Sequence, residues 1–170
     1  MSAFGPTSRP TRALGWYALS VLRLLVAGVL LATALGKSLD LTGFATVVGT
    51  YQALPERAWF MAGTALTVLE WSLGVWLLSG WRLPHAALGA ASLHILFTTW
   101  AAVALMRGID VPNCGCFGVF YARPLTVSTV FEDLFMLALC LLMYGLARRY
   151  QVTTQVKSAP GPESGGAARL

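Results

Sequence analysis

The sequence predicts an all-α integral membrane protein, a four-helix transmembrane bundle with short connections. Of its 170 residues, 56% are hydrophobic and only 11% are charged, whereas about a quarter of the residues of a typical soluble domain are charged. Four apolar blocks are each long enough to cross a bilayer, because a span of about 30 Å needs about 20 helical residues. The remaining connections and ends are too short for a separate soluble domain.

The four apolar blocks cover residues 16–35, 58–80, 85–106 and 125–146. Between the first two, apolar side chains recur at near-helical spacing, which predicts an interfacial helix that lies on the bundle and is ended by Pro55. Residues 80–84 predict a tight turn. Residues 16–147 thus form one membrane domain, and the polar tails 1–15 and 148–170 are expected to be disordered and cytoplasmic.

The distribution of Lys and Arg predicts how the chain is oriented in a bacterial-type inner membrane. With Arg23 left out, seven lie at the termini and in the second connection, against four in the first and third connections. Basic residues favour the cytoplasmic side, so both termini are expected there. An alternative is a cleaved signal peptide ending at residues 32–34, but Arg23 interrupts its apolar region. The net charge of +5 is explained by topology and indicates no nucleic acid partner.

The third connection carries the most informative motif, Cys114-Gly115-Cys116. The predicted topology places it outside the cytoplasm, where a disulfide can persist. Two cysteines this close would close a small, strained ring, for which Gly115 supplies backbone freedom. Strain makes a disulfide more oxidising, so the pair suits thiol–disulfide exchange. Alternatives are a static disulfide or free pair that shapes the loop, and a metal site.

No metal is assigned to the cysteine motif, because a closed zinc site needs four ligands. The two histidines, His85 and His94, lie in or beside the third span and far from the loop. The third cysteine, Cys140, lies well inside the fourth span and is interpreted as a small core residue.

Three ionisable residues, Arg23, Glu70 and His94, lie inside apolar spans, where a charge is costly unless it is paired. Depths counted along the spans place all three in one layer. Each shares a helix face with small residues, which mark helix contacts in a bilayer. We therefore predict an ion pair between Arg23 and Glu70 with His94 nearby. This layer either fixes helix packing or lines a site for a quinone head group or a proton path.

A second charged group lies near the outer edge of the predicted bundle. Lys37 ends the first span, and Glu132 and Asp133 lie early in the fourth, where the helix dipole favours acidic residues. We expect the two acids to pair with Lys37 or Arg123 beneath the cysteine loop. They would either cap the helix or tune the thiols.

Five motifs follow one another along the chain: Arg23, Gly36-Lys37, a Tyr-x-x-Leu-Pro segment at 51–55, Glu70, and Cys-Gly-Cys-Phe-Gly at 114–118. This order, over roughly residues 16–146, resembles the MauE family of methylamine-utilisation membrane proteins in the DoxX-like superfamily. The resemblance implies a protein that helps to mature an exported, disulfide-containing client beside a thioredoxin-like protein. DoxX-like relatives include quinone-linked subunits, so a membrane quinone is the implied cofactor. The family often has a basic residue where this chain has Glu132.

The first functional hypothesis is a membrane thiol–disulfide exchange or electron-transfer protein, with Cys114 and Cys116 as its redox pair. The pair would exchange with an extracytoplasmic thioredoxin-like partner and pass electrons to a quinone, as a quinone-linked oxidoreductase does. The chain has no second cysteine pair for an internal relay, so the partner or quinone must meet the loop directly. The alternative is a non-catalytic scaffold or assembly factor with a structural cysteine loop. The least favoured hypothesis is a small transporter, because no span has the sequence pattern of a broken helix.

Overall fold

The computed structural model describes the backbone of residues 10–158 and the side chains of residues 15–150. It contains five helices, α1 (Pro10–Ser38), α2 (Leu41–Thr50), α3 (Glu56–Ser79), α4 (Leu83–Met106) and α5 (Val127–Ser158). All but α2 are long and apolar enough to cross a membrane, and the described range contains no strand. The predicted four-helix membrane bundle is therefore confirmed.

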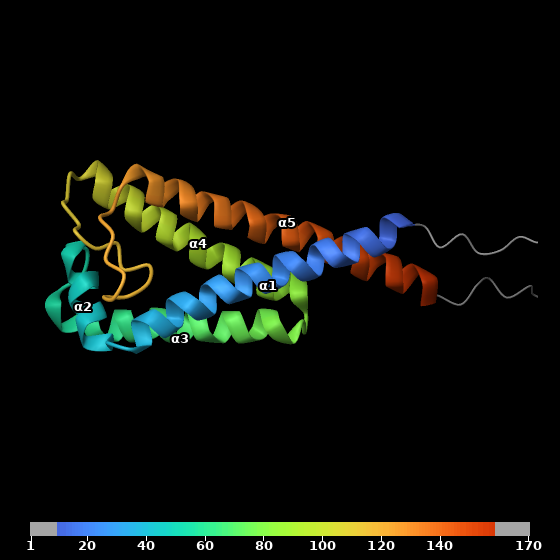
Figure 1. The fold of residues 1–170 in the computed structure, drawn as a ribbon, viewed down its shortest axis with the longest axis horizontal. Helices are drawn as coiled ribbons and strands as arrows, with labels where there is room; N and C mark the ends of the chain where they lie inside the picture. The colour runs from blue at the N-terminus through green and yellow to red at the C-terminus, as the bar shows by residue number, and fades with distance from the viewer. Residues whose placement is uncertain (1–9, 159–170) are drawn as a thin grey trace, which may run out of the picture.

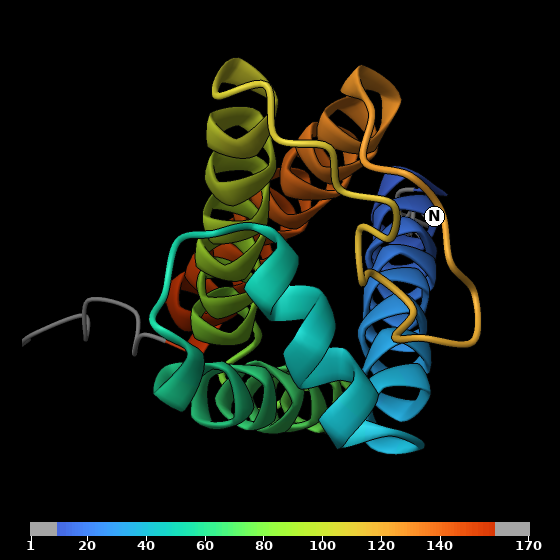
Figure 2. The ribbon, with the colours of Figure 1, turned by 90° about the vertical axis from the view of Figure 1, so that its left-hand side faces the viewer.

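The four long helices pack mainly as two pairs, α1 against α3 and α4 against α5. The short helix α2 and the loop of residues 107–126 lie together at one end of the bundle, and α2 crosses that end (Figures 1 and 2). The start of α1, the turn between α3 and α4, and the end of α5 all point to the other end (Figure 1). The cysteine motif thus lies at the end that α2 covers.

Local signals explain where most of these helices begin and end. Asp40 caps α2, since its Oδ1 accepts a hydrogen bond of 2.7 Å from the backbone N–H of Gly43. The predicted interfacial helix forms, but it ends at Thr50 rather than at Pro55, because Gln52 adopts a left-handed φ of 51°. The predicted tight turn at 80–84 is confirmed, with φ values of 69° at Gly80 and 46° at Arg82.

The first and last helices of the chain, α1 and α5, extend further than the apolar pattern predicts. α1 already begins at Pro10 and α5 continues to Ser158, so both enter segments that were expected to be disordered. The expectation for residues 1–9 and 159–170 lies outside the described residues.

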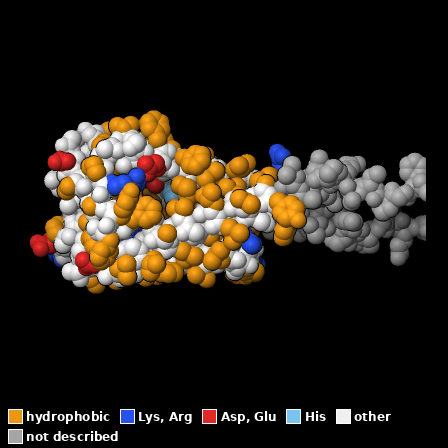
Figure 3. Space-filling view, viewed as in Figure 1, with side chains coloured by type: hydrophobic (Ala, Val, Ile, Leu, Met, Phe, Trp, Pro, Cys, Tyr) orange, Lys and Arg blue, Asp and Glu red, His pale blue; other side chains and the backbone are white. Residues whose placement is uncertain are grey.

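Small residues mediate the contact between α1 and α3, as the pattern predicts. Ala27 and Ala34 are fully buried, and a Cβ atom at Gly74 would lie 2.7 Å from Leu31 Cγ. The exterior of the bundle is covered largely by hydrophobic side chains, whereas acidic side chains gather at the end with α2 and the loop (Figure 3). This distribution is typical of a membrane-embedded bundle with a polar cap.

Candidate functional site

A cavity of about 640 Å³ lies beneath α2 and the cysteine loop, between the four spanning helices. Its lining is mostly apolar and aromatic. Its ionisable side chains come from the four spanning helices, from the loop and from Tyr51, which directly follows α2: Lys37, Tyr51, Glu70, His94, Cys114, Cys116, Arg123, Glu132 and Asp133. Among the predicted site residues, only Arg23 is not part of this lining.

The deepest polar contact is an ion pair between Lys37 Nζ and Glu70 Oε1. Both residues are buried, with 3% of Lys37 and 1% of Glu70 exposed. The ammonium group also lies 5.4 Å from the ring centroids of both Phe44 and Phe97, a distance at which aromatic rings attract a cation. The sequence placed Lys37 at the outer edge and Glu70 in a deeper layer, but the long lysine side chain joins the two groups.

The predicted ion pair between Arg23 and Glu70 is wrong. The Arg23 guanidinium lies beside Gly80, the residue that ends α3. Ten residues separate Gly80 from Glu70, which corresponds to about 15 Å along a helix. The depth estimate was wrong because it assumed that the first helix begins at Trp16. Helix α1 instead begins at Pro10, and Arg23 lies at the level of the turn between α3 and α4. At the carbonyl end of α3, a cation is favourably placed.

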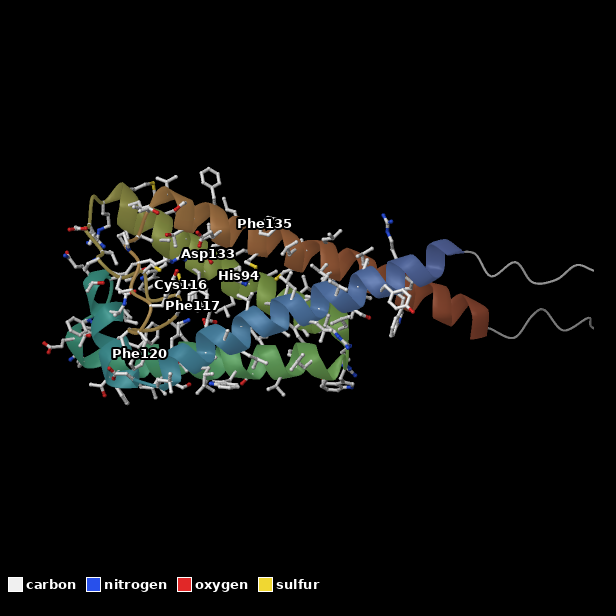
Figure 4. The ribbon with its side chains drawn as sticks, viewed as in Figure 1. His94, Cys116, Phe117, Phe120, Asp133 and Phe135 are labelled. Atoms are coloured by element: carbon white, nitrogen blue, oxygen red, sulfur yellow. The ribbon has the colours of Figure 1, made fainter. Side chains whose placement is uncertain are left out.

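The two neighbouring acids of α5 point to different partners. Glu132 forms a two-pronged ion pair with Arg123, at 3.2 and 2.8 Å, which confirms one of the predicted pairings. Asp133 instead faces inward, with its Oδ1 3.6 Å from Nδ1 of His94. Figure 4 shows His94, Asp133 and Cys116 grouped between α4, α5 and the loop. Adjacent residues on a helix point about 100° apart, so one acid can serve the surface and the other the cavity.

The cysteine loop is held by its own backbone and by close contact with α1. The backbone N–H of Cys114 donates to the carbonyl oxygen of Arg123 at 2.7 Å, and the Tyr51 hydroxyl donates to the carbonyl oxygen of Cys114 at 2.8 Å. Burial raises the pKa of Tyr51, which keeps this donor protonated. A Cβ atom at Gly118 would lie against the Gly36 carbonyl oxygen, so glycine at both positions lets the loop rest on the end of α1.

Asn113 shapes the turn that presents the two sulfurs. Its side-chain oxygen accepts from the N–H of Gly115 at 2.9 Å, and its amide donates to the carbonyl oxygen of Gly118 at 3.1 Å. Gly115 itself has a φ of 76°, a left-handed value that glycine adopts without strain. The turn thereby brings the side chains of Cys114 and Cys116 to the same place.

Cys114 and Cys116 are free thiols whose sulfurs lie 3.0 Å apart, within hydrogen-bonding distance. The hydrogen bond from the Cys116 thiol lowers the pKa of Cys114 to about 6, and the Arg123 charge acts in the same direction. The same bond and burial raise the pKa of Cys116. Since the thiolate is the reactive form of cysteine, the pair holds one thiolate and one thiol near neutral pH.

This asymmetry predicts the pH dependence of cysteine alkylation. In the purified protein, the rate at which iodoacetamide modifies Cys114 should reach half its maximum near pH 6. In Cys116→Ala, which removes the hydrogen-bond donor, the midpoint should rise toward the ordinary value of about 8.5. Site-resolved mass spectrometry measures both, with Cys140→Ala as the control. An unchanged midpoint in Cys116→Ala would contradict the assigned hydrogen bond.

Comparison with known proteins identifies the family of the chain. The family model for methylamine utilisation protein MauE matches residues 15–145. The chain belongs to the MauE family. The methylamine utilization protein MauE of Paracoccus denitrificans is 31% identical over 120 residues, which are 71% of this chain and 64% of that protein. The chain therefore spans about 64% of the length of this curated relative. No solved structure matches the chain.

Membership of the MauE family and the four spans make the chain a multi-pass membrane protein. Most of the motifs quoted above meet at the cavity, namely Lys37, Tyr51, Glu70 and the two cysteines. The sequence did not indicate Asn113, or that the Tyr51 hydroxyl would bind the loop. It also missed the aromatic lining from α4, because Phe97 and Trp100 look like ordinary span residues.

Proposed function

We propose that this chain is a membrane thiol–disulfide exchange protein. Its Cys114–Cys116 pair takes electrons from an extracytoplasmic thioredoxin-like protein and thereby supports disulfide formation in an exported client. The observation that carries this proposal is the contact of two free sulfurs, 3.0 Å apart, one of which has a pKa of about 6. The MauE family and the Paracoccus relative support a role beside other proteins of methylamine utilisation.

The exchange step follows from the different positions of the two sulfurs. In the oxidised pair, a thiolate of the partner attacks Sγ of Cys116, the more exposed of the two cysteines. The bond between the two sulfurs breaks, and Cys114 leaves as a thiolate, which its low pKa favours. The second thiol of the partner then attacks the mixed disulfide and its proton passes to Cys116. The partner leaves as a disulfide, and this chain keeps the reduced pair.

The proposal includes an orientation with both termini in the cytoplasm and the cysteine loop outside it. The start of α1 and the end of α5 lie at the same end of the bundle, opposite the cysteine loop (Figure 1). Arg148 and Arg149 follow the last apolar block, and basic residues favour the cytoplasmic side. In this orientation the sulfurs face an oxidising compartment.

The test uses the full-length protein in lipid nanodiscs, oxidised and then mixed with a reduced thioredoxin that retains only its attacking cysteine. We expect a covalent adduct that maps to Cys116 and forms equally well in Cys140→Ser. The double variant Cys114→Ser/Cys116→Ser should form none and should lose client disulfides in cells. A pair that stays oxidised under mild reductants, together with full client maturation in the double variant, would favour the scaffold instead.

A further inference from the structure

The reduced cysteine pair must be reoxidised before it can act again. Within the described residues the third cysteine cannot do this, because Cys140 is fully buried in the core and is not part of the cavity lining. Both Cys114 and Cys116, however, line the cavity. An electron acceptor that entered the cavity would therefore meet the two sulfurs directly.

The cavity is suited to an apolar ligand that arrives from the bilayer. Its volume of about 640 Å³ lies in the range of small-molecule sites, and aromatic rings of Phe97, Trp100 and Phe117 line it. Phe135 belongs to the same lining, yet it is 64% exposed on a membrane-spanning part of α5 (Figure 4). Phe135 therefore contacts both the cavity and the lipid-facing surface of the bundle at this helix.

The cavity wall also holds buried polar atoms that lack partners among the described side chains. His94 is 4% exposed, and neither of its ring nitrogens makes a hydrogen bond. Glu70 Oε2 makes none either, since the neighbouring Thr33 hydroxyl donates to the Leu30 carbonyl oxygen at 2.9 Å. Buried polar groups nearly always have a partner, so these atoms point to a polar ligand group.

Hydrogen-bond donors are available at two places on the wall. The Lys37 ammonium has three N–H groups, and its ion pair with Glu70 Oε1 uses one of them. The imidazole of His94, beside Asp133, supplies a ring N–H. A flat apolar molecule with two carbonyl oxygens matches both the aromatic lining and these donors.

We propose that the cavity binds a membrane quinone, whose carbonyl oxygens accept hydrogen bonds from Lys37 and His94 and which reoxidises the cysteine pair. This inference rests on the proposed function. Two electrons pass from the sulfurs to the quinone as the bond between Cys114 and Cys116 forms. The proton of the Cys116 thiol and a second proton, taken up from water by way of His94, complete the quinol. Asp133, whose Oδ1 lies 3.6 Å from Nδ1 of His94, places a carboxylate beside the imidazole.

The experiment uses the full-length, reduced protein in nanodiscs with decylubiquinone in the absence of oxygen. We expect one quinol per protein molecule, formed together with the loss of both loop thiols. The double variant Cys114→Ser/Cys116→Ser should bind decylubiquinone but form no quinol. His94→Leu should weaken binding at least tenfold, and His94→Gln, which keeps a donor, should restore part of it. Asp110→Asn, which removes an exposed loop carboxylate, serves as the control.

The outcomes separate this inference from the proposed function. If the protein forms the thioredoxin adduct but neither binds nor reduces decylubiquinone, the quinone site is wrong and the exchange function stands. If it reduces decylubiquinone but forms no adduct, the exchange function is wrong. Binding that His94→Leu leaves unchanged, or that phospholipid displaces completely, would also overturn the assigned site.

Discussion

Lys37→Met is expected to destabilise the folded protein by about 3–5 kcal/mol, the usual cost of leaving one partner of a buried ion pair unpaired. Lys37 and Glu70 are both almost completely buried, so water cannot replace the lost ammonium group. Methionine has a similar length and preserves the packing against Phe44 and Phe97. The free energy of unfolding, measured by denaturant titration of the protein in mixed micelles, tests this expectation.

Two further variants show whether the charge itself is responsible. Lys37→Met/Glu70→Leu removes both charges and should recover most of the lost stability, because a buried pair can often be replaced by apolar residues. Arg123→Met breaks a pair whose side chains are 34% and 53% exposed, and exposed pairs contribute less than about 1 kcal/mol. If Lys37→Met cost no more than Arg123→Met, the buried pair would not be a stabilising contact.

Gly115→Ala is expected to disrupt the cysteine pair without altering either cysteine. The φ of 76° at Gly115 costs an alanine about 1–2 kcal/mol. The new Cβ would also lie 2.9 Å from Val47 Cγ1 and 3.0 Å from Phe44 Cε2, an overpacking that typically costs about 1–3 kcal/mol more. The loop should shift away from α2, separate the sulfurs and raise the alkylation midpoint of Cys114 above pH 6.

Gly108→Ala is the matched control for this substitution. Gly108 has a similar φ of 66°, but a Cβ there would meet nothing within 4 Å. It should therefore show the backbone cost alone and leave the reactivity of Cys114 unchanged. Equal alkylation profiles in the two variants would mean that contact with α2 does not position the thiols.

The sequence predicted the fold well because each span needs only length and apolar composition, which are local properties. It also located the reactive loop, since only one residue separates Cys114 from Cys116 in the sequence. The pairing of buried charges was harder to predict, because it depends on how far each helix extends. Arg23 was assigned to Glu70 on that ground, although Lys37 is the actual partner. The cavity could not be predicted, since its walls come from segments that only the tertiary structure brings together.

The close backbone contact between Gly36 and Gly118 joins the cysteine loop to the end of α1, one residue before the lysine that faces the cavity. A protein that binds the loop from outside would therefore also change the position of Lys37. Binding free energies linked in this way are reciprocal. A ligand that binds in the cavity and favours one loop position should change the affinity of the protein for an outside partner by some factor. The outside partner should change the affinity of the protein for the cavity ligand by the same factor.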